Sequence, residues 1–170
     1  FTLEMPIVIG AMSFGALSER AKVALAKAST LAGTIANTGE GGMLESERQA
    51  AKYLTAQYST ARFGVDENYL KRADVIEIKI GQGAKPGQGG LLPAKKITPK
   101  IAEIRKIKLG EDCHSPAYHS DIKTPDDLKN KVEWLRKITG VKPIVIKLAA
   151  GDIEEDLKIA VFANPDIIAI

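Results

Sequence analysis

The sequence predicts an α/β fold built around a parallel sheet, in a single domain over residues 1–170. Short apolar runs, typical of strands buried on both faces, alternate with helical patterns, and this alternation is typical of parallel sheets whose strands are joined by helices. Hydrophobic residues make up 45% of the 170 residues, enough for a packed core. We count about five or six strands, whereas a closed barrel has eight strands and about 250 residues. We therefore expect an incomplete TIM (β/α)8 barrel without its C-terminal βα units, or an open doubly wound sheet.

The first part of the chain predicts two strands separated by a helix. Residues 6–12 (PIVIGAM) form an apolar run after a proline, and residues 34–37 are the second strand. Ser18 is a suitable cap for the helix between them, and Gly33 ends it. The expected buried side of this helix consists of Ala21, Leu25, Ala28 and Ala32.

The middle of the chain is less regular. Residues 41–70 predict an insertion with a helix near residues 45–57 and a short strand at residues 62–65. Residues 75–80 (VIEIKI) are the next strand. Residues 81–95 contain five glycines and two prolines, which indicates a loop and not a helix or strand.

Two helices are expected between residues 98 and 140. The first covers residues 98–107, with Ile101, Ile104 and Ile107 facing inward. Thr124 caps the second, Pro125 lies in its first turn, and Gly140 ends it. The buried stripe of the second helix is expected to consist of Leu128, Val132, Leu135 and Ile138.

The last thirty or so residues predict a strand, a helix and a further strand. Residues 143–148 (PIVIKL) are a buried strand, and Asp152 opens a helix with a pair of residues resembling a capping box. Asn164 and Pro165 end this helix, and residues 166–170 are the last strand.

Composition excludes several classes of protein. The net charge of +3 comes with no basic block interleaved with aromatic residues, so we expect no nucleic-acid partner. Cys113 is the single cysteine, which excludes an internal disulfide and fits a cytoplasmic location. No apolar run reaches the roughly 20 residues of a membrane span, so no membrane partner is expected. The start lacks a methionine and a signal peptide, and the end reads as an unfinished strand, so both ends are expected to be cuts.

Ligands of parallel α/β proteins bind at the carboxyl ends of the strands, and three loops with suitable residues follow predicted strands. Residues 11–18 (AMSFGALS) contain small residues that let a flat ligand approach the backbone. Residues 37–42 (NTGEGG) place Glu40 among three glycines, where it could transfer a proton or bind an amino group. Residues 81–90 match neither a P-loop nor a dinucleotide-binding fingerprint. Each loop could also be an ordinary turn or linker.

Two further features have more than one interpretation. Residues 113–121 hold both histidines and Asp121, but they lack a helical frame for metal ligands, so we expect no metal site. Lys147 lies near the end of a buried strand, where a lysine is costly unless it is paired or reaches a site. It could form a Schiff base with a carbonyl substrate, stabilise a reduced flavin as a nearby cation, or extend its stem to solvent.

Taken together, these segments resemble the synthase domain of the glutamate synthase family. The resemblance covers nearly the whole chain and keeps the order of the family's motifs. It is carried by residues 11–18 (AMSFGALS), 37–42 (NTGEGG), 62–65 (RFGV) and 82–87 (QGAKPG), by Ser115, Pro116, His119, Asp121 and Ile122, and by residues 145–148 (VIKL).

The resemblance implies an FMN-binding barrel in which ammonia from glutamine condenses with 2-oxoglutarate. Reduced FMN then passes a hydride to 2-iminoglutarate, giving L-glutamate. It also implies a glutaminase partner and an electron donor, ferredoxin or NADPH, as domains or subunits. Electrons reach FMN through an iron–sulfur cluster, which we expect in the full-length protein and not in this segment, because one cysteine cannot hold a cluster. We expect this segment alone to be inactive.

The resemblance also assigns residues. Ala11, Met12, Ser13, Asn37 and Lys147 are expected to bind the flavin, and Ser13 also the substrate. The residues expected to be catalytic or to bind the substrate are Glu40 near the imine nitrogen, and Lys85 and Arg105 as clamps for the substrate carboxylates.

Three positions depart from the family pattern. Leu91 stands where a glutamine is expected, Ser120 replaces a second histidine, and Gln88 replaces a common glutamate. Alternatives for the function are a flavin domain for N-methylglutamate synthesis, a Schiff-base lyase that uses Lys147, and a non-catalytic binding subunit.

Overall fold

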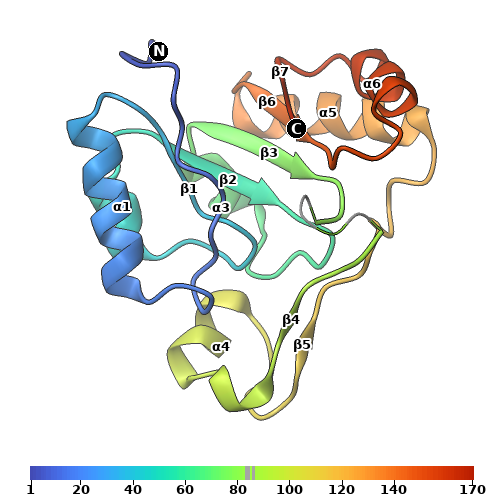
Figure 1. The fold of residues 1–170 in the computed structure, drawn as a ribbon. Coiled ribbons are helices and arrows are strands. Elements are labelled where there is room, and N and C mark those ends of the chain that lie inside the picture. Colours follow the sequence, from blue (N-terminus) through green and yellow to red (C-terminus); the bar gives the residue numbers. More distant parts are fainter. Residues whose placement is uncertain (83–84, 86) are drawn as a thin grey trace.

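A computed structural model describes residues 1–82, 85 and 87–170 and contains one sheet of five parallel strands (Figure 1). The order across the sheet is β1-β2-β3-β6-β7. An open doubly wound sheet would reverse this order at a switch point, so the continuous order agrees with the incomplete barrel. The strands are β1 (Ala36–Asn37), β2 (Leu54–Tyr58), β3 (Val75–Lys79), β6 (Ile144–Lys147) and β7 (Ile167–Ala169).

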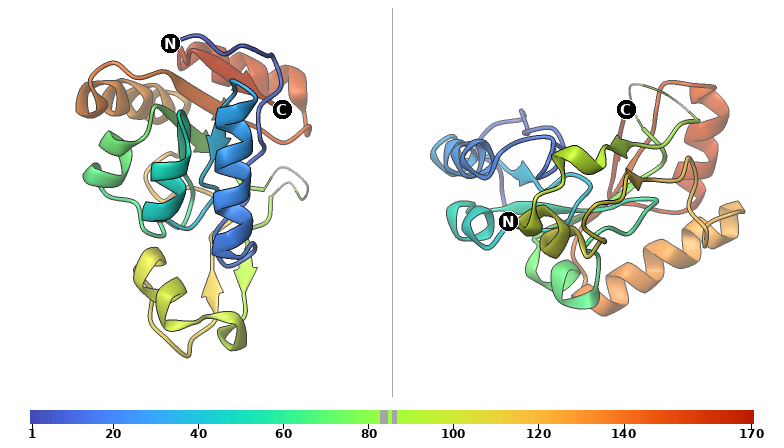
Figure 2. Two further views of the ribbon diagram at one scale, coloured as in Figure 1. Left: turned by 90° about the vertical axis from the view of Figure 1, so that its left-hand side faces the viewer. Right: turned by 90° about the horizontal axis from the view of Figure 1, so that it is seen from below.

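Helices cover one face of the sheet, and a small lobe projects from one of its ends. In Figure 1, α1 lies at the left, α5 and α6 at the right, and the lobe formed by α4, β4 and β5 lies below. The left view of Figure 2 shows the same lobe at the bottom. The strands β4 (Leu91–Leu92) and β5 (Cys113–His114) pair antiparallel. The helices are α1 (Glu19–Leu31), α2 (Glu45–Ala50), α3 (Glu67–Arg72), η1 (Ala94–Lys96), α4 (Pro99–Arg105), α5 (Pro125–Thr139) and α6 (Ile153–Phe162).

The main core lies between the sheet and the helices α3, α5 and α6. Alternate strand residues face opposite sides of a sheet, so Ile76 and Ile78 pack outward against Val132 and Leu135 of α5. The residues that alternate with these isoleucines along β3, Val75 and Glu77, face the other side of the sheet. This inner face borders a cavity of about 480 Å³.

The helix boundaries in the second half confirm the sequence predictions. Thr124 accepts a hydrogen bond from the backbone of Asp127, whose side chain accepts one from Thr124 in return, which completes a capping box. Gly140 ends α5 with a φ of 75°, a conformation that glycine adopts without strain. The predicted strands at 143–148 and 166–170 are β6 and β7. Asp152 precedes α6 as predicted, but its side chain makes no capping hydrogen bond.

The prediction of a buried strand at residues 6–12 was wrong. The segment is extended and its backbone amide at Ile9 donates to Ile35 O, but no strand forms, and Ile7 and Val8 are 68% and 56% exposed. The predicted buried stripe of α1 was also wrong. The buried residues are Lys22, Ala26 and Ser29, because this face carries a buried charge that an apolar pattern cannot reveal.

The predictions for residues 45–65 were partly wrong. The helix stops at Ala50, and residues 54–58 form β2, which is buried throughout because it pairs with β1 and β3 on its two sides. Residues 62–65 form a turn in which Arg62 and Gly64 have positive φ angles, not a strand. The predicted loop at 81–95 contains β4 and η1 at its end, and Gly83, Ala84 and Pro86 of its motif lie outside the described residues.

Truncating the core residue Leu135 to alanine should destabilise the fold. Leu135 has no exposed surface, so we expect Leu135→Ala to lower the free energy of unfolding by about 2–5 kcal/mol, measured by urea denaturation. Leu31→Ala is the matched control, because Leu31 is also helical but 89% exposed, and it should cost less than about 0.5 kcal/mol. Equal losses in the two variants would contradict this description of the core.

Candidate functional site

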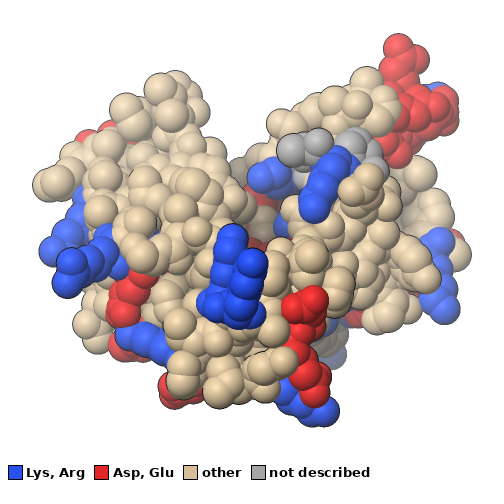
Figure 3. Space-filling view, turned by 60° about the horizontal axis from the view of Figure 1, so that its bottom comes forward, with Lys and Arg blue, Asp and Glu red and all other residues tan. Residues whose placement is uncertain are grey.

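A cavity of about 420 Å³ lies where the carboxyl ends of β2, β3 and β6 meet the lobe. Figure 3 shows a hollow between the two sides of the molecule, with Lys and Arg side chains along its border. The described residues that line the cavity are Ala11, Met12, Ser13, Ala16, Leu17, Glu40, Gln57, Phe63, Lys79, Gln82, Gly90, Leu91, Leu92, Arg105, Cys113, Ser115 and Lys147.

Glu40 is the single acidic residue among those lining residues. Its Oε2 forms an ion pair with Lys79 Nζ at 3.0 Å and lies 3.4 Å from Gln82 Nε2. Its Oε1 is buried and has no hydrogen-bond partner among the described residues. A buried carboxylate oxygen without a partner is costly, so this atom is suited to a donor supplied by a ligand.

The glycines around Glu40 allow its loop to pack tightly. Gly39 has a φ of 67°, and a Cβ there would lie 2.5 Å from the backbone of Met12 and Ser13. Gly41 has a φ of 149°, and a Cβ would lie 3.0 Å from the guanidinium of Arg105. The loop is therefore buried against its neighbours and is not the exposed turn that a glycine-rich sequence can also form.

Two lysines stand at equivalent positions on neighbouring strands. Lys79 of β3 and Lys147 of β6 are partners in the parallel register, and both line the cavity. Each follows the pattern Ile-x-Ile-Lys, in which the lysine faces inward and the isoleucines face the helices. Within the described part of the chain, Lys79 is paired with Glu40 and Lys147 has no ion pair.

Arg105, at the end of α4, links the lobe to the loop that follows residues 6–12. It is 5% exposed, its Nε and Nη2 donate to Phe14 O, and its Nη2 also donates to Ser13 Oγ at 3.0 Å. Its Nη1 lies 3.9 Å from Cys113 Sγ. Burial raises the pKa of the Cys113 thiol, with nearby Arg105 opposing this shift.

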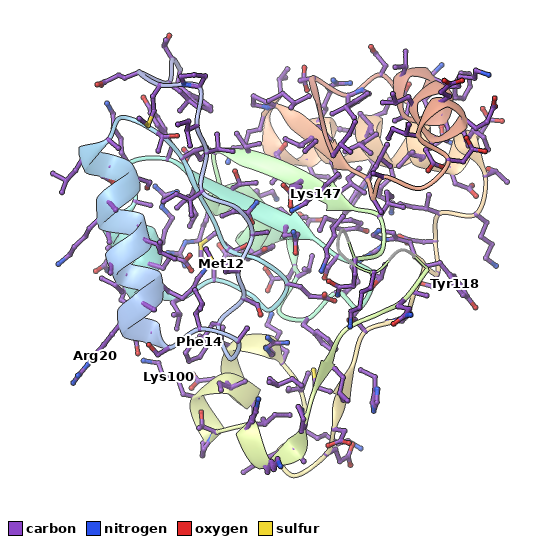
Figure 4. The ribbon with its side chains drawn as sticks, in the orientation of Figure 1. Met12, Phe14, Arg20, Lys100, Tyr118 and Lys147 are labelled. Carbon is purple, nitrogen blue, oxygen red and sulfur yellow. The ribbon has the colours of Figure 1, made fainter. Side chains whose placement is uncertain are left out.

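The structure brings most of the predicted site residues together. Figure 4 shows the labelled Met12 on the N-terminal segment in front of the sheet, whereas Arg20 points outward from α1. Asn37 does not line this cavity but lines the cavity of about 480 Å³ on the inner face of the sheet, where its Nδ2 donates to Glu77. Lys85 is exposed. The predicted residues that line the cavity are Ala11, Met12, Ser13, Glu40, Arg105 and Lys147.

Lys79 and the polar side chains Gln57 and Ser115 also line the cavity, although they were not among the site residues predicted from the sequence. Lys79 could have been found because its strand ends in the same Ile-x-Ile-Lys pattern as that of Lys147. Gln57 could not, because β2 was expected to be a helix there. Its Nε2 donates to Glu77 Oε1 at 2.6 Å and joins the inner face of the sheet to the cavity wall.

Both ring nitrogens of His119 have hydrogen-bond partners in the protein. Its Nδ1 faces Arg62 at 2.7 Å and its Nε2 faces Lys79 O at 2.8 Å. Because a guanidinium can only donate, Nδ1 must accept and Nε2 must donate, so the ring is neutral. Among the described residues, no group of three or more His, Cys, Asp or Glu side chains could hold a metal ion, and no described helix is long and apolar enough to cross a membrane.

The fold and the cavity define a parallel α/β barrel protein whose candidate ligand site lies at the carboxyl edge of the sheet. A family model described as a conserved region in glutamate synthase matches residues 1–170. The chain belongs to this glutamate synthase family.

Relatives in bacteria and archaea share this segment. A glutamate synthase large subunit-like protein of Rhizobium meliloti is 43% identical over 99% of this chain, and an archaeal glutamate synthase [NADPH] of Archaeoglobus fulgidus is 46% identical over 99%. The chain spans only 38% and 33% of these relatives.

Solved structures of mandelate oxidase mutants have the same fold. One, with an FMN adduct, has a TM-score of 0.56 at 16% identity, and another, with (S)-mandelic acid, has a TM-score of 0.58 at 16% identity. The match covers 98% of this chain and 48% and 47% of theirs. This likeness supports a partial barrel as the fold, in preference to an open doubly wound sheet.

Because His119 is neutral in the folded protein, we predict that the free energy of unfolding falls in mild acid. Burial, and secondly the charge of Arg62, lower the pKa of His119 from 6.5 to about 4. Between these values the unfolded chain binds a proton that the folded protein excludes, so the free energy of unfolding should fall as the pH drops from 6.5 to 4, by up to ~3 kcal/mol.

Urea denaturation across this pH range measures the effect. His119→Gln keeps an amide donor but cannot titrate, and it should remove most of this slope. His114→Gln is the control, because His114 is exposed on β5, and it should leave the slope unchanged. An unaltered slope in the His119 variant would disprove the assignment.

Proposed function

We propose that this chain forms the flavin and substrate cavity of an enzyme that makes L-glutamate from 2-oxoglutarate and glutamine-derived ammonia. The observation that carries the proposal is Oε1 of Glu40, which has no partner among the described residues, in a cavity that Lys79, Arg105 and Lys147 also line. Membership of the glutamate synthase family and the names of the relatives support it.

The charges of the cavity suit a dicarboxylate. Among the described residues, three cationic side chains and one carboxylate line it, and the ion pair with Lys79 neutralises the carboxylate. Lys147 and Arg105 are then left to attract anionic groups, since Arg105 Nη1 has two N–H groups and only one of them is used by Cys113. Lys85 is the further carboxylate ligand of this proposal, on the loop that follows Gln82.

The residues present also fit an FMN ring. Ala11, Met12 and Leu17 give the cavity an apolar side for a flat ring, and Lys147 supplies the positive charge that stabilises a reduced flavin. Gly90 lets the side chains of Ser115 and Gln82 pack against its backbone at the cavity wall, because a Cβ there would lie 2.8 Å from Ser115 Oγ and 3.0 Å from Gln82 Nε2. FMN, when bound, supplies the hydride that reduces the imine.

Glu40 would donate or accept the proton at the substrate nitrogen. Ammonia replaces the C2 oxygen of 2-oxoglutarate, which leaves as water, and the resulting imine gains a hydride at carbon and a proton at nitrogen. Lys79 holds Oε2 of Glu40, so Oε1 remains to accept a hydrogen bond from the nitrogen or to carry its proton. Arg105 fixes Ser13, whose backbone packs against Gly39 beside Glu40.

Other parts of the complete protein would supply ammonia and electrons. We propose a glutaminase domain or subunit, and ferredoxin or NADPH as the electron donor. The NADPH in the names of the archaeal relatives supports the latter. An iron–sulfur cluster would need cysteines outside residues 1–170, because Cys113 is the single cysteine here.

Replacing Glu40 with glutamine should slow catalysis more than binding. Glu40→Gln keeps a side chain of the same size but removes the proton carrier, so we expect kcat to fall by about 10²–10⁴-fold. The measurement is glutamate formation from 2-oxoglutarate by the complete protein with its electron donor. Ammonia and methylamine are compared as nitrogen donors, and a preference for methylamine would favour N-methylglutamate synthesis.

Glu111→Gln is the control for Glu40, since the side chain of Glu111 is 67% exposed, and it should keep wild-type kcat. Full activity of the Glu40 variant would remove Glu40 from the mechanism.

Replacing Lys147 with methionine should weaken flavin binding. The variant loses the cation beside the ring, so we expect the dissociation constant for FMN to rise by about tenfold or more, corresponding to ~1.4 kcal/mol, measured by flavin fluorescence. Lys137→Met, on the exposed side of α5, should have no effect. Borohydride trapping of a keto-acid on Lys147, found by mass spectrometry, would instead support Schiff-base chemistry.

A further inference from the structure

Lys22 of α1 and Glu47 of α2 form a deeply buried ion pair behind the cavity. Lys22 Nζ lies 2.7 Å from Glu47 Oε1, and the side chains are 2% and 1% exposed. Burial lowers the pKa of Lys22 and raises that of Glu47, and the attraction between the two charges opposes both shifts. Buried ion pairs seldom stabilise a fold more than apolar residues of the same volume would, so this pair calls for another explanation.

The lysine ammonium also binds three backbone carbonyls from two separate segments. Lys22 Nζ donates to Met12 O at 2.6 Å, to Asn37 O at 2.9 Å and to Thr38 O at 3.0 Å. Met12 belongs to the N-terminal segment that lines the cavity, and Asn37 ends β1 just before the loop of Glu40. One buried cation therefore joins the two segments.

A second contact joins the same segments without involving Lys22. Gly39 approaches the backbone of Met12 and Ser13 so closely that a Cβ would lie 2.5 Å away, and its amide donates to Asn37 Oδ1 at 2.9 Å. No strand pairing holds Met12, because residues 6–12 form none. The position of the Met12 wall thus depends on the Lys22 ammonium, on this close packing and on the contacts of Arg105 with Ser13 and Phe14.

We propose that Lys22 is a positioning residue that holds the Met12–Ser13 wall against the Glu40 loop and so sets the shape of the flavin cavity. Lys22 touches no ligand and acts through the carbonyls of Met12, Asn37 and Thr38. Glu47 offsets the cost of burying the ammonium, while the three carbonyls are acceptors that Lys22 keeps without it. The inference rests on the function proposed above.

Variants of the pair separate positioning from stability. Lys22→Met leaves Glu47 buried without a partner, so it should lower both thermal stability and FMN affinity. The double variant Lys22→Met/Glu47→Met removes both charges, so stability should recover while the three carbonyls stay unbound. Glu47→Gln keeps Lys22 and its carbonyl contacts, so it should lose stability but keep its FMN affinity.

The experiment uses the complete protein and measures the unfolding midpoint, the FMN dissociation constant by fluorescence, and the kcat and KM for 2-oxoglutarate. We expect the FMN dissociation constant to rise about tenfold or more in both variants that lack Lys22, with a lower kcat, although the double variant unfolds close to the wild-type temperature. Arg48→Met/Asp74→Asn removes a partly buried ion pair between α2 and the residue before β3, neither of which lines the 420 Å³ cavity. This variant shows how much FMN affinity is lost through stability alone.

Wild-type FMN affinity in the double variant would overturn the inference and leave the proposed function intact. A loss of FMN affinity in Glu47→Gln that is proportional to its loss of stability would also overturn the inference. If the double variant does not fold, the Glu47→Gln measurement decides between positioning and stability. If the wild-type protein binds no FMN, the proposed function fails and the role of Lys22 fails with it.

Discussion

All five strands of the sheet run in the same direction, and the site depends on this constraint. A parallel strand cannot be followed by a tight hairpin, so the chain must cross back over the helical face before the next strand begins. The segments that leave the strands therefore gather at one edge. The loop of Glu40 leaves β1, Lys79 ends β3, and Lys147 ends β6. Residues separated by more than a hundred positions in sequence thereby line one cavity.

Within this edge, each charge is held by a particular contact. Lys79 fixes one oxygen of Glu40, and the other has no partner in the part of the chain that the structure describes. Arg105 reaches from the lobe to Ser13 and Phe14, and Lys22 holds the same N-terminal segment from behind. The cavity wall that carries Met12 is not a strand of the sheet, so side-chain contacts with backbone carbonyls hold it in place.

Sequence patterns predicted the parts of the fold that local chemistry decides. The capping box at Thr124, the glycine stop at Gly140 and the strands that end in Lys79 and Lys147 follow from propensity and periodicity. The pattern failed where tertiary contacts decide. Residues 54–58 look helical alone but form β2 between two partner strands, and the buried face of α1 contains Lys22, whose partner Glu47 lies on another helix. The family resemblance named Glu40 and Arg105, but their partners became visible only in three dimensions.

We propose that Oε1 of Glu40 meets the nitrogen of the substrate in a cavity that also holds a flavin. The most direct measurement is a crystal structure of the complete protein soaked with L-glutamate, the product. We predict the amino group within hydrogen-bond distance of Glu40 Oε1 and the carboxylates near Arg105 and Lys85. Glutamate bound elsewhere, with Glu40 Oε1 facing only solvent or protein, would contradict the account.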